Sequence, residues 1–120
     1  MRHIKLFEGF SDSLYDEISY DEFSIEMDKN PNDDSSHKKW KFLEKNIKSI
    51  YKTEIIHHVF TATSSEVDND HPNDICILRK DDEWYLVRIE FHRTRQKYGY
   101  YRCDQWEGLM RLLKDKGIIK

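Results

Sequence analysis

The chain has 120 residues, of which 36% are charged and 38% hydrophobic, and its formal net charge is −3. This length fits one domain, and an aromatic content of 13% provides for a packed core that an intrinsically disordered chain lacks. No apolar run approaches the ~18 residues of a membrane span, and residues 1–8 are not continuously apolar, so we expect neither a span nor a secretory signal. Two cysteines, Cys76 and Cys103, are too few for a disulfide framework, which indicates a cytoplasmic location.

The first part of the chain predicts a short strand and two helices. Tyr15 to Ser19 is a candidate strand, and Ser19 is a candidate N-cap for a helix with acidic residues in its first turn. The apolar alternation of residues 23–27 also permits a strand there. A clearer helix is capped by Ser35 or Ser36 and runs to Ile50, because apolar residues recur three and four positions apart and lysines lie between them.

From Glu54 onward the apolar period changes to two and β-branched residues dominate. This pattern predicts one strand over residues 54–60. The rings of His57 and His58 would then point to opposite faces of a sheet.

Residues 74–79 and 84–92 predict a β-hairpin with its turn at residues 81–82, which sets Leu78 opposite Tyr85. In this register one face is entirely apolar, and it carries Cys76, Leu78, Tyr85, Val87, Ile89 and Phe91. The other face is mostly polar, as expected of an antiparallel sheet that is covered on one side.

The end of the chain predicts a short strand over residues 98–101 and then a helix. Asp104 is a candidate N-cap, Glu107 would complete a capping box, and Gly117 is placed to end the helix. Cys103 lies just before this helix, where a thiol pKa tends to fall. It is therefore a candidate nucleophile, although no base for it is evident.

Together the elements predict a single α+β domain over residues 1–120, with residues 1–14 loosely attached. The expected architecture is an antiparallel three- to four-stranded meander covered on one face by N-terminal helices and a C-terminal helix. The four glycines are too sparse for a phosphate-binding loop or a dinucleotide fingerprint, and zinc, calcium and serine-hydrolase motifs are absent. We therefore expect no enzymatic activity and no cofactor.

Two alternatives to that expectation involve side chains of the predicted sheet. The first is a metal or proton-transfer cluster, whose candidate members are His57, His58, Asp74, Glu90 and His92. The second is a small metal-dependent nuclease, because Asp74 and the pair Glu90 and His92 resemble the restriction-type nucleases. In that family an aspartate, then a glutamate and a lysine two positions apart, hold a divalent metal. His92 stands in place of the lysine, and the predicted hairpin sets Asp74 and Glu90 out of direct register.

The stretch from Arg88 to Arg102 combines basic and aromatic residues with a single acidic residue, Glu90. Arginine binds phosphate through paired hydrogen bonds and tyrosine stacks on nucleobases, so this composition favours an anionic ligand such as a nucleotide. The candidate binding residues are Arg88, Arg93, Arg95, Lys97, Tyr98, Tyr100 and Arg102. A net charge of −3 argues against general coating of DNA.

Charge alternates along the chain in blocks. The net charge is −7 over residues 1–34, +4 over 35–61, −5 over 62–87 and +5 over 88–120. Blocks of this kind predict separate solvated surfaces, and an acidic surface beside a basic one would offer the basic one to an anionic partner.

Both ends of the chain resemble small proteins of large tailed bacteriophages. The segment Lys5-Leu6-Phe7-Glu8-Gly9-Phe10 is similar to a short N-terminal segment that recurs on such proteins. The segment Tyr100-Tyr101-Arg102-Cys103-Asp104-Gln105, followed by Gly108-Leu109, resembles the end of others. The resemblance implies a viral accessory protein in the host cytoplasm, and it implies no activity or catalytic residue.

The expected function is binding without catalysis, in counter-defence or host takeover. The expected partner is a host protein or a nucleotide. Nucleic acid is less favoured, and no membrane is expected. A homodimer is expected as well, because a domain of this size offers only shallow pockets. The alternative outside this class is a virion-associated structural protein that docks through its Phe7 and Phe10 segment.

Overall fold

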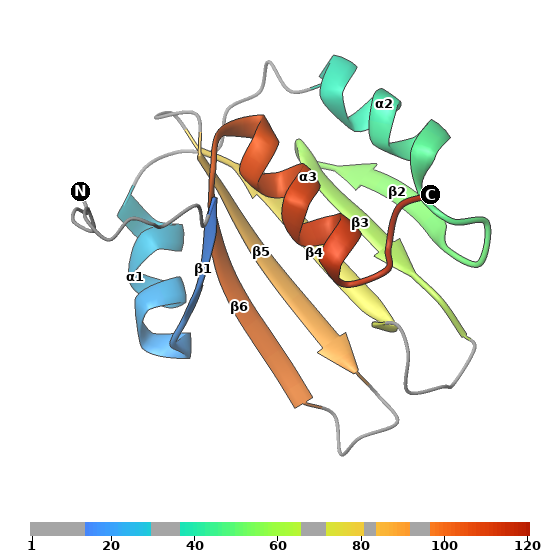
Figure 1. Ribbon diagram of the computed structural model, residues 1–120. Helices are drawn as coiled ribbons and strands as arrows, with labels where there is room; N and C mark the ends of the chain where they lie inside the picture. Colours follow the sequence, from blue (N-terminus) through green and yellow to red (C-terminus); the bar gives the residue numbers. More distant parts are fainter. Residues whose placement is uncertain (1–13, 30–36, 66–71, 81–83, 92–96) are drawn as a thin grey trace.

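The computed structural model describes residues 14–29, 37–65, 72–80, 84–91 and 97–120 and shows three helices packed on one antiparallel sheet (Figure 1). The elements follow the chain in the order β1 (Tyr15–Ile18), α1 (Tyr20–Lys29), α2 (His37–Asn46), β2 (Lys52–Ile56), β3 (Val59–Thr63), β4 (Asp74–Arg79), β5 (Trp84–Phe91), β6 (Lys97–Asp104) and α3 (Gln105–Asp115). None of the helices in these ranges is long and apolar enough to cross a membrane.

The sheet has six strands in the order β1-β6-β5-β4-β3-β2. Strands β2 to β6 form a continuous meander, and β1 pairs with β6 at the far edge. The α+β class is confirmed, whereas the expected number of three to four strands is wrong. The extra strands arise because β1 joins the sheet and because residues 52–63 form two strands instead of one.

The division of residues 52–63 occurs at His57 and His58, which form a two-residue turn. Their φ angles are 50° and 68°, and positive φ at both central residues is the pattern of a type I′ hairpin turn. Histidine enters this left-handed region more readily than most residues other than glycine. The expectation that both histidines lie within one strand is therefore wrong.

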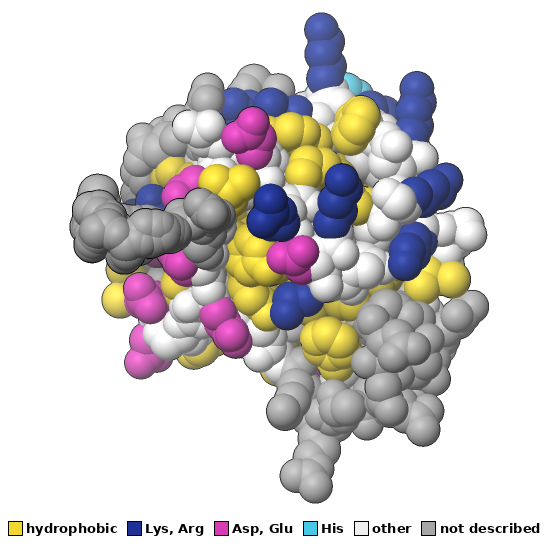
Figure 2. Space-filling model, viewed as in Figure 1, with side chains coloured by type: hydrophobic (Ala, Val, Ile, Leu, Met, Phe, Trp, Pro, Cys, Tyr) yellow, Lys and Arg dark blue, Asp and Glu magenta, His cyan; other side chains and the backbone are white. Residues whose placement is uncertain are grey.

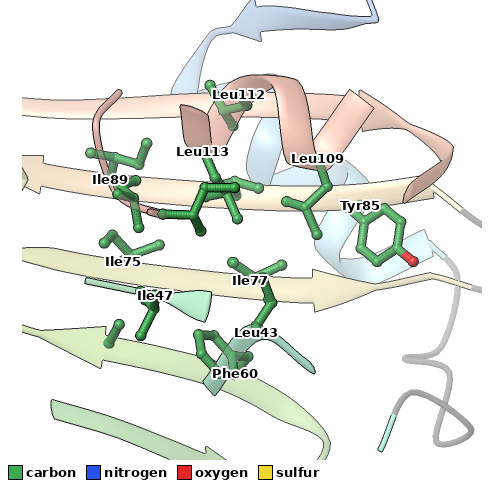
Figure 3. Packing of buried hydrophobic residues seen from close by; sticks show 14 of the residues in the cluster. Leu43, Ile47, Phe60, Ile75, Ile77, Tyr85, Ile89, Leu109, Leu112 and Leu113 are labelled. Carbon is green, nitrogen blue, oxygen red and sulfur yellow. The ribbon is translucent and has the colours of Figure 1, made fainter. Parts of the chain in front are cut away.

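The two faces of the sheet are best followed on β5, whose side chains alternate between them. Tyr85, Val87 and Ile89 of β5 pack against α2 and α3. Figure 3 shows the leucines of α3 pointing toward the strands of the sheet. The buried residues of this face, which we call the α2–α3 face, are Trp40, Leu43, Ile47, Tyr51, Phe60, Ala62, Ile75, Ile77, Tyr85, Val87, Ile89, Tyr101, Cys103, Leu109, Leu112, Leu113, Ile118 and Ile119.

The opposite face, which we call the α1 face, has a smaller core. Phe23 of α1 is buried there against Leu78, Trp84 and Leu86. The amino group of Lys80, itself almost fully buried, donates a hydrogen bond of 2.9 Å to the carbonyl oxygen of Met27 in the last turn of α1. The sheet is thus covered on both faces, and the expectation of cover on one face only is wrong.

The register predicted for β4 and β5 is wrong, and this error led to the expectation that only one face of the sheet is covered. Leu78 lies opposite Leu86 and not opposite Tyr85, so the true pairing is shifted by one residue. The backbone N–H of Lys80 donates to the carbonyl of Trp84, which leaves three residues between the paired positions where two were expected. A shift of one residue moves a whole strand's side chains to the other face. Here it divides the apolar residues between two cores.

The sequence predicted helix ends at Ser19, Asp104 and Gly117, and all three residues lie where a helix begins or ends. At α1, Ser19 Oγ accepts a hydrogen bond of 3.1 Å from the N–H of Glu22. At the end of α3, Gly117 has a φ of 72° and the N–H of Ile118 donates to the carbonyl of Leu113, which is the Schellman arrangement. The α3 helix begins directly after Asp104, as predicted, but the Asp104 side chain makes no capping hydrogen bond, so the predicted capping box is wrong.

One further boundary differs from the sequence expectation. The α2 helix ends at Asn46 and not at Ile50, because Ile47 forms a β-bridge with Ile119. In α3, Gly108 lies against the start of β1, where a Cβ atom would come within 2.2 Å of the Leu14 carbonyl oxygen. Residues 1–13 and the expected caps at Ser35 and Ser36 lie outside the described residues.

Candidate ligand-binding surface

Beyond α1, the α1 face carries a group of polar and aromatic side chains on β5 and β6. Arg88 lies directly opposite Tyr100, and Glu90 lies directly opposite Tyr98. We call these four residues the sheet site. They share one face because each pair occupies aligned positions, two residues apart along its strand.

The two tyrosines of the sheet site, Tyr98 and Tyr100, form a stacked pair. Their rings are stacked with centroids 6.2 Å apart and planes 8° from parallel. Tyr100 is fixed from the other side by Phe23 and Tyr20 of α1, at 4.9 and 5.5 Å between ring centroids. Tyr98 is 50% exposed, so an aromatic ring held in a defined plane is available to solvent.

Charged groups of both signs surround this pair of tyrosines. Arg88 is exposed, and a hydrogen bond to Glu90 raises the pKa of the Tyr98 hydroxyl. Asp74 of β4 lies directly opposite Glu90. Cys76 lies beside Arg88, and burial raises its thiol pKa while the arginine charge opposes that rise. The site therefore combines a guanidinium donor, carboxylate acceptors and a ring for stacking.

Of the other predicted ligand-binding residues, the structure places only the side chain of Arg102, which contacts Trp84 and Glu26. The guanidinium of Arg102 lies 4.0 Å from the centre of the Trp84 ring, and one of its nitrogens lies 3.8 Å from a carboxylate oxygen of Glu26. Arg102 thus helps to hold α1 on the sheet. Arg93 and Arg95 lie outside the described residues, and of Lys97 only its place at the start of β6 is described.

Of the proposed cluster of histidines and carboxylates, His57 and His58 lie away from Asp74. His57 and His58 lie at the end of the β2–β3 hairpin, next to Val59, whereas Asp74 pairs with Thr63 at the other end of β3. The four residue-to-residue steps from Val59 to Thr63 separate the two positions by roughly 13 Å. His92 lies outside the described residues, and within the described ranges no three histidine, cysteine, aspartate or glutamate residues are grouped to hold a metal.

Instead, the two histidines border an open pocket of about 620 Å³ between α2 and the β2–β3 turn. His37, Lys41 and Glu44 of α2 line its other side. The indole N–H of Trp40 donates a hydrogen bond of 2.9 Å to the carbonyl oxygen of His58, which ties the turn to the helix. The turn therefore has a structural role in placing α2.

The two carboxylates of the nuclease hypothesis are closer than the sequence indicated. Asp74 and Glu90 are direct partners on β4 and β5, so the expectation that they are out of register is wrong. The cause is the same one-residue shift that alters the hairpin faces. Cys103, the other catalytic candidate, is fully buried, and burial raises its thiol pKa, contrary to the expected lowering.

The sequence did not show that the basic residues of α2 and α3 lie on one side of the molecule. Lysine and arginine side chains gather over α2 and α3, whereas acidic side chains gather toward α1 and β1 (Figure 2). The basic residues of these two helices are Lys38, Lys39, Lys41, Lys45, Arg111 and Lys114. The positive net charge of residues 35–61 and 88–120 was the available signal, although Arg88 and Arg102 of the second block lie on the α1 face.

Comparison with known protein families, with curated proteins and with solved structures found no significant match.

Proposed function

We propose that the protein is a non-enzymatic accessory protein of a bacteriophage, which acts in the host cytoplasm by binding a nucleotide ligand at the sheet site. The observation that carries the proposal is the exposed, oriented ring of Tyr98 beside Arg88. A ring fixed in its plane stacks on a nucleobase with little loss of conformational freedom. The phage origin rests on the resemblance of the two chain ends.

Each group of the site has a distinct role in this proposal. Tyr98 stacks on the base, and Arg88 binds phosphate through its planar donors. Glu90 and Asp74 accept hydrogen bonds from ribose hydroxyls or from amino groups of the base. Arg93, Arg95 and Lys97 add phosphate contacts, as the sequence predicts. These roles describe binding in counter-defence or host takeover, with no bond made or broken.

Calorimetry with linear and cyclic nucleotides tests the proposal. Tyr98→Ala is expected to weaken binding at least about fivefold through loss of stacking, whereas Tyr98→Phe retains it. Arg88→Ala is expected to weaken binding of phosphorylated ligands more than that of nucleosides. Arg111→Ala is the matched control, because this exposed arginine lies on α3 across the sheet. Absence of heat with every nucleotide would overturn the nucleotide ligand and leave a host protein, which a pull-down from lysate would identify.

One observation favours a second candidate, the metal-dependent nuclease. Asp74 and Glu90 face each other on adjacent strands, and paired carboxylates are suitable ligands for Mg²⁺. Incubating plasmid DNA and RNA with the protein and Mg²⁺ or Mn²⁺ tests this candidate. Cleavage that is lost in Glu90→Gln would support it, and intact substrates would remove it.

A further inference from the structure

The outer surface of α1 carries an apolar side chain within an acidic ring. Ile25 is 59% exposed. Its neighbours three and four positions away on the helix surface are Asp21, Glu22 and Asp28, all exposed. The fourth neighbour, Lys29, forms an ion pair of 3.3 Å with Glu26. This surface therefore presents an isoleucine surrounded by negative charge.

The outer surface of α2 also carries an exposed apolar side chain, and the residues around it are positively charged. Phe42 is 49% exposed, and its neighbours at the same helical spacings are Lys38, Lys39 and Lys45. The Phe42 ring packs edge-on against Trp106 of α3, with centroids 5.9 Å apart. This contact fixes the direction in which the ring projects.

The nearby acidic residue of α2 does not cancel this positive charge. Glu44 is only partly exposed and forms an ion pair of 3.4 Å with Lys41. It also accepts a hydrogen bond of 3.4 Å from Thr53 Oγ1. The three lysines around Phe42 therefore dominate the electrostatic character of this surface.

We propose that a second copy of this chain is the partner of these surfaces, with α1 of one molecule packed on α2 of the next. Ile25 would contact Phe42, and the acidic ring would lie on the lysine ring. The two helices of one molecule cannot meet each other, because α1 packs on one face of the sheet and α2 on the other. Each molecule therefore offers one surface to each of two neighbours, and the contact is head-to-tail.

Such a contact depends strongly on salt. Two ten-residue helices bury little apolar area, so the opposite charges provide much of the specificity. Exposed charges are screened over about 10 Å at 0.1 M salt. Self-association should therefore be strongest at low ionic strength and should weaken at least about tenfold between 20 and 300 mM salt.

Charge-reversal variants test the proposal by sedimentation velocity at low salt. Asp21→Lys/Asp28→Lys and Lys38→Glu/Lys45→Glu should each be monomeric under conditions in which the unaltered protein associates. Mixing the two variants, or combining all four substitutions in one chain, should restore association, because the charges are then complementary again. Lys114→Glu/Lys120→Glu changes the net charge as Lys38→Glu/Lys45→Glu does, so it is the control for the lysine variant and should associate normally. Circular dichroism checks that every variant is folded.

Two results would overturn the proposal. The first is an unaltered protein that stays monomeric at low salt, and the second is failure of the mixed variants to associate. Fluorescence anisotropy with a labelled single-stranded oligonucleotide identifies the competing occupant. If the protein is monomeric and the lysine-ring variant loses oligonucleotide binding, the α2 surface serves a nucleic acid and not a second copy. Neither result bears on the sheet site, whose residues are all on β5 and β6.

Discussion

The two faces of the sheet differ in the size of the hydrophobic core that the helices bury against them. On the α2–α3 face, two helices and the C-terminal residues enclose a continuous core that spans β3 to β6. On the α1 face, one helix buries a single residue, Phe23, against three residues of the sheet. The better covered face provides most of the stability. Because α1 covers only part of the other face, polar and aromatic side chains there remain available for a ligand.

The largest expected effect comes from opening the α2–α3 core. Phe60 is fully buried and lies against Trp40, with ring centroids 5.7 Å apart. Phe60→Ala should lower the free energy of unfolding by about 3–5 kcal/mol, because it leaves a cavity in a core that cannot collapse around it. Chemical denaturation measures this loss. A loss below about 1 kcal/mol would contradict the central place of this core.

The matched substitution on the other face is Phe23→Ala. It should cost about 3 kcal/mol or less, at or below the low end of the range for phenylalanine, because α1 can separate while the sheet persists. Hydrogen exchange should show lost protection in α1 and retained protection in β4 and β5. Equal loss of protection in both regions would show that the two cores unfold together and would remove the distinction between the faces.

Gly108→Ala tests the close approach of α3 to β1. Alanine normally stabilises a helix by about 1 kcal/mol over glycine, but here the new methyl group meets the Leu14 carbonyl oxygen. The substitution should destabilise by about 1–3 kcal/mol. Arg111→Ala, at an exposed position of the same helix, should change stability by less than about 0.5 kcal/mol. A stabilising Gly108→Ala would contradict the contact.

The smallest expected effect concerns the tie between β1 and α3. The Tyr15 hydroxyl donates a hydrogen bond of 2.6 Å to a carboxylate oxygen of Asp115, and this bond, together with burial, raises the pKa of Tyr15 to about 12. A raised pKa means that the bond stabilises the fold below the ordinary tyrosine value of about 10 and that this stabilisation is lost as pH rises through about 12.

Tyr15→Phe should therefore cost at most about 1 kcal/mol at neutral pH, and the difference from the unaltered protein should shrink above pH 10. Absorbance at alkaline pH provides an independent check. The tyrosine that is missing from Tyr15→Phe should titrate at about pH 12 in the unaltered protein. In Asp115→Asn the same tyrosine should titrate at a lower pH, and an unchanged titration would remove the proposed tie.

Local sequence signals predicted the elements of this fold well. The apolar spacing between Trp40 and Leu43 located α2, Ser19 and Gly117 marked helix ends, and residues 74–79 proved to be a strand with those bounds. These features depend on short-range contacts that the sequence displays directly. Arg88, Tyr98 and Tyr100 were also among the predicted binding residues, because basic and aromatic side chains are concentrated in residues 88–102.

The remaining features depend on pairings that no local pattern determines. In the structure, three residues separate the hydrogen-bonded residues Lys80 and Trp84, and this spacing sets the register of β4 and β5. The sequence Asp81-Asp82 favoured a turn of two residues. His57 and His58 lack the glycine or asparagine that normally identifies a type I′ turn. Arg102 could not be separated from the binding residues by composition, because its partners Trp84 and Glu26 are distant in the sequence.

The most direct measurement combines stability and binding for one substitution on each face. Leu112→Ala, in the α2–α3 core, should lose about 2–5 kcal/mol of stability and keep its nucleotide affinity while it remains folded. Tyr98→Ala should keep its unfolding midpoint and lose nucleotide affinity. A Tyr98→Ala protein that binds every tested nucleotide as the unaltered protein does would contradict the account, because the open face of the sheet would then not be the binding surface.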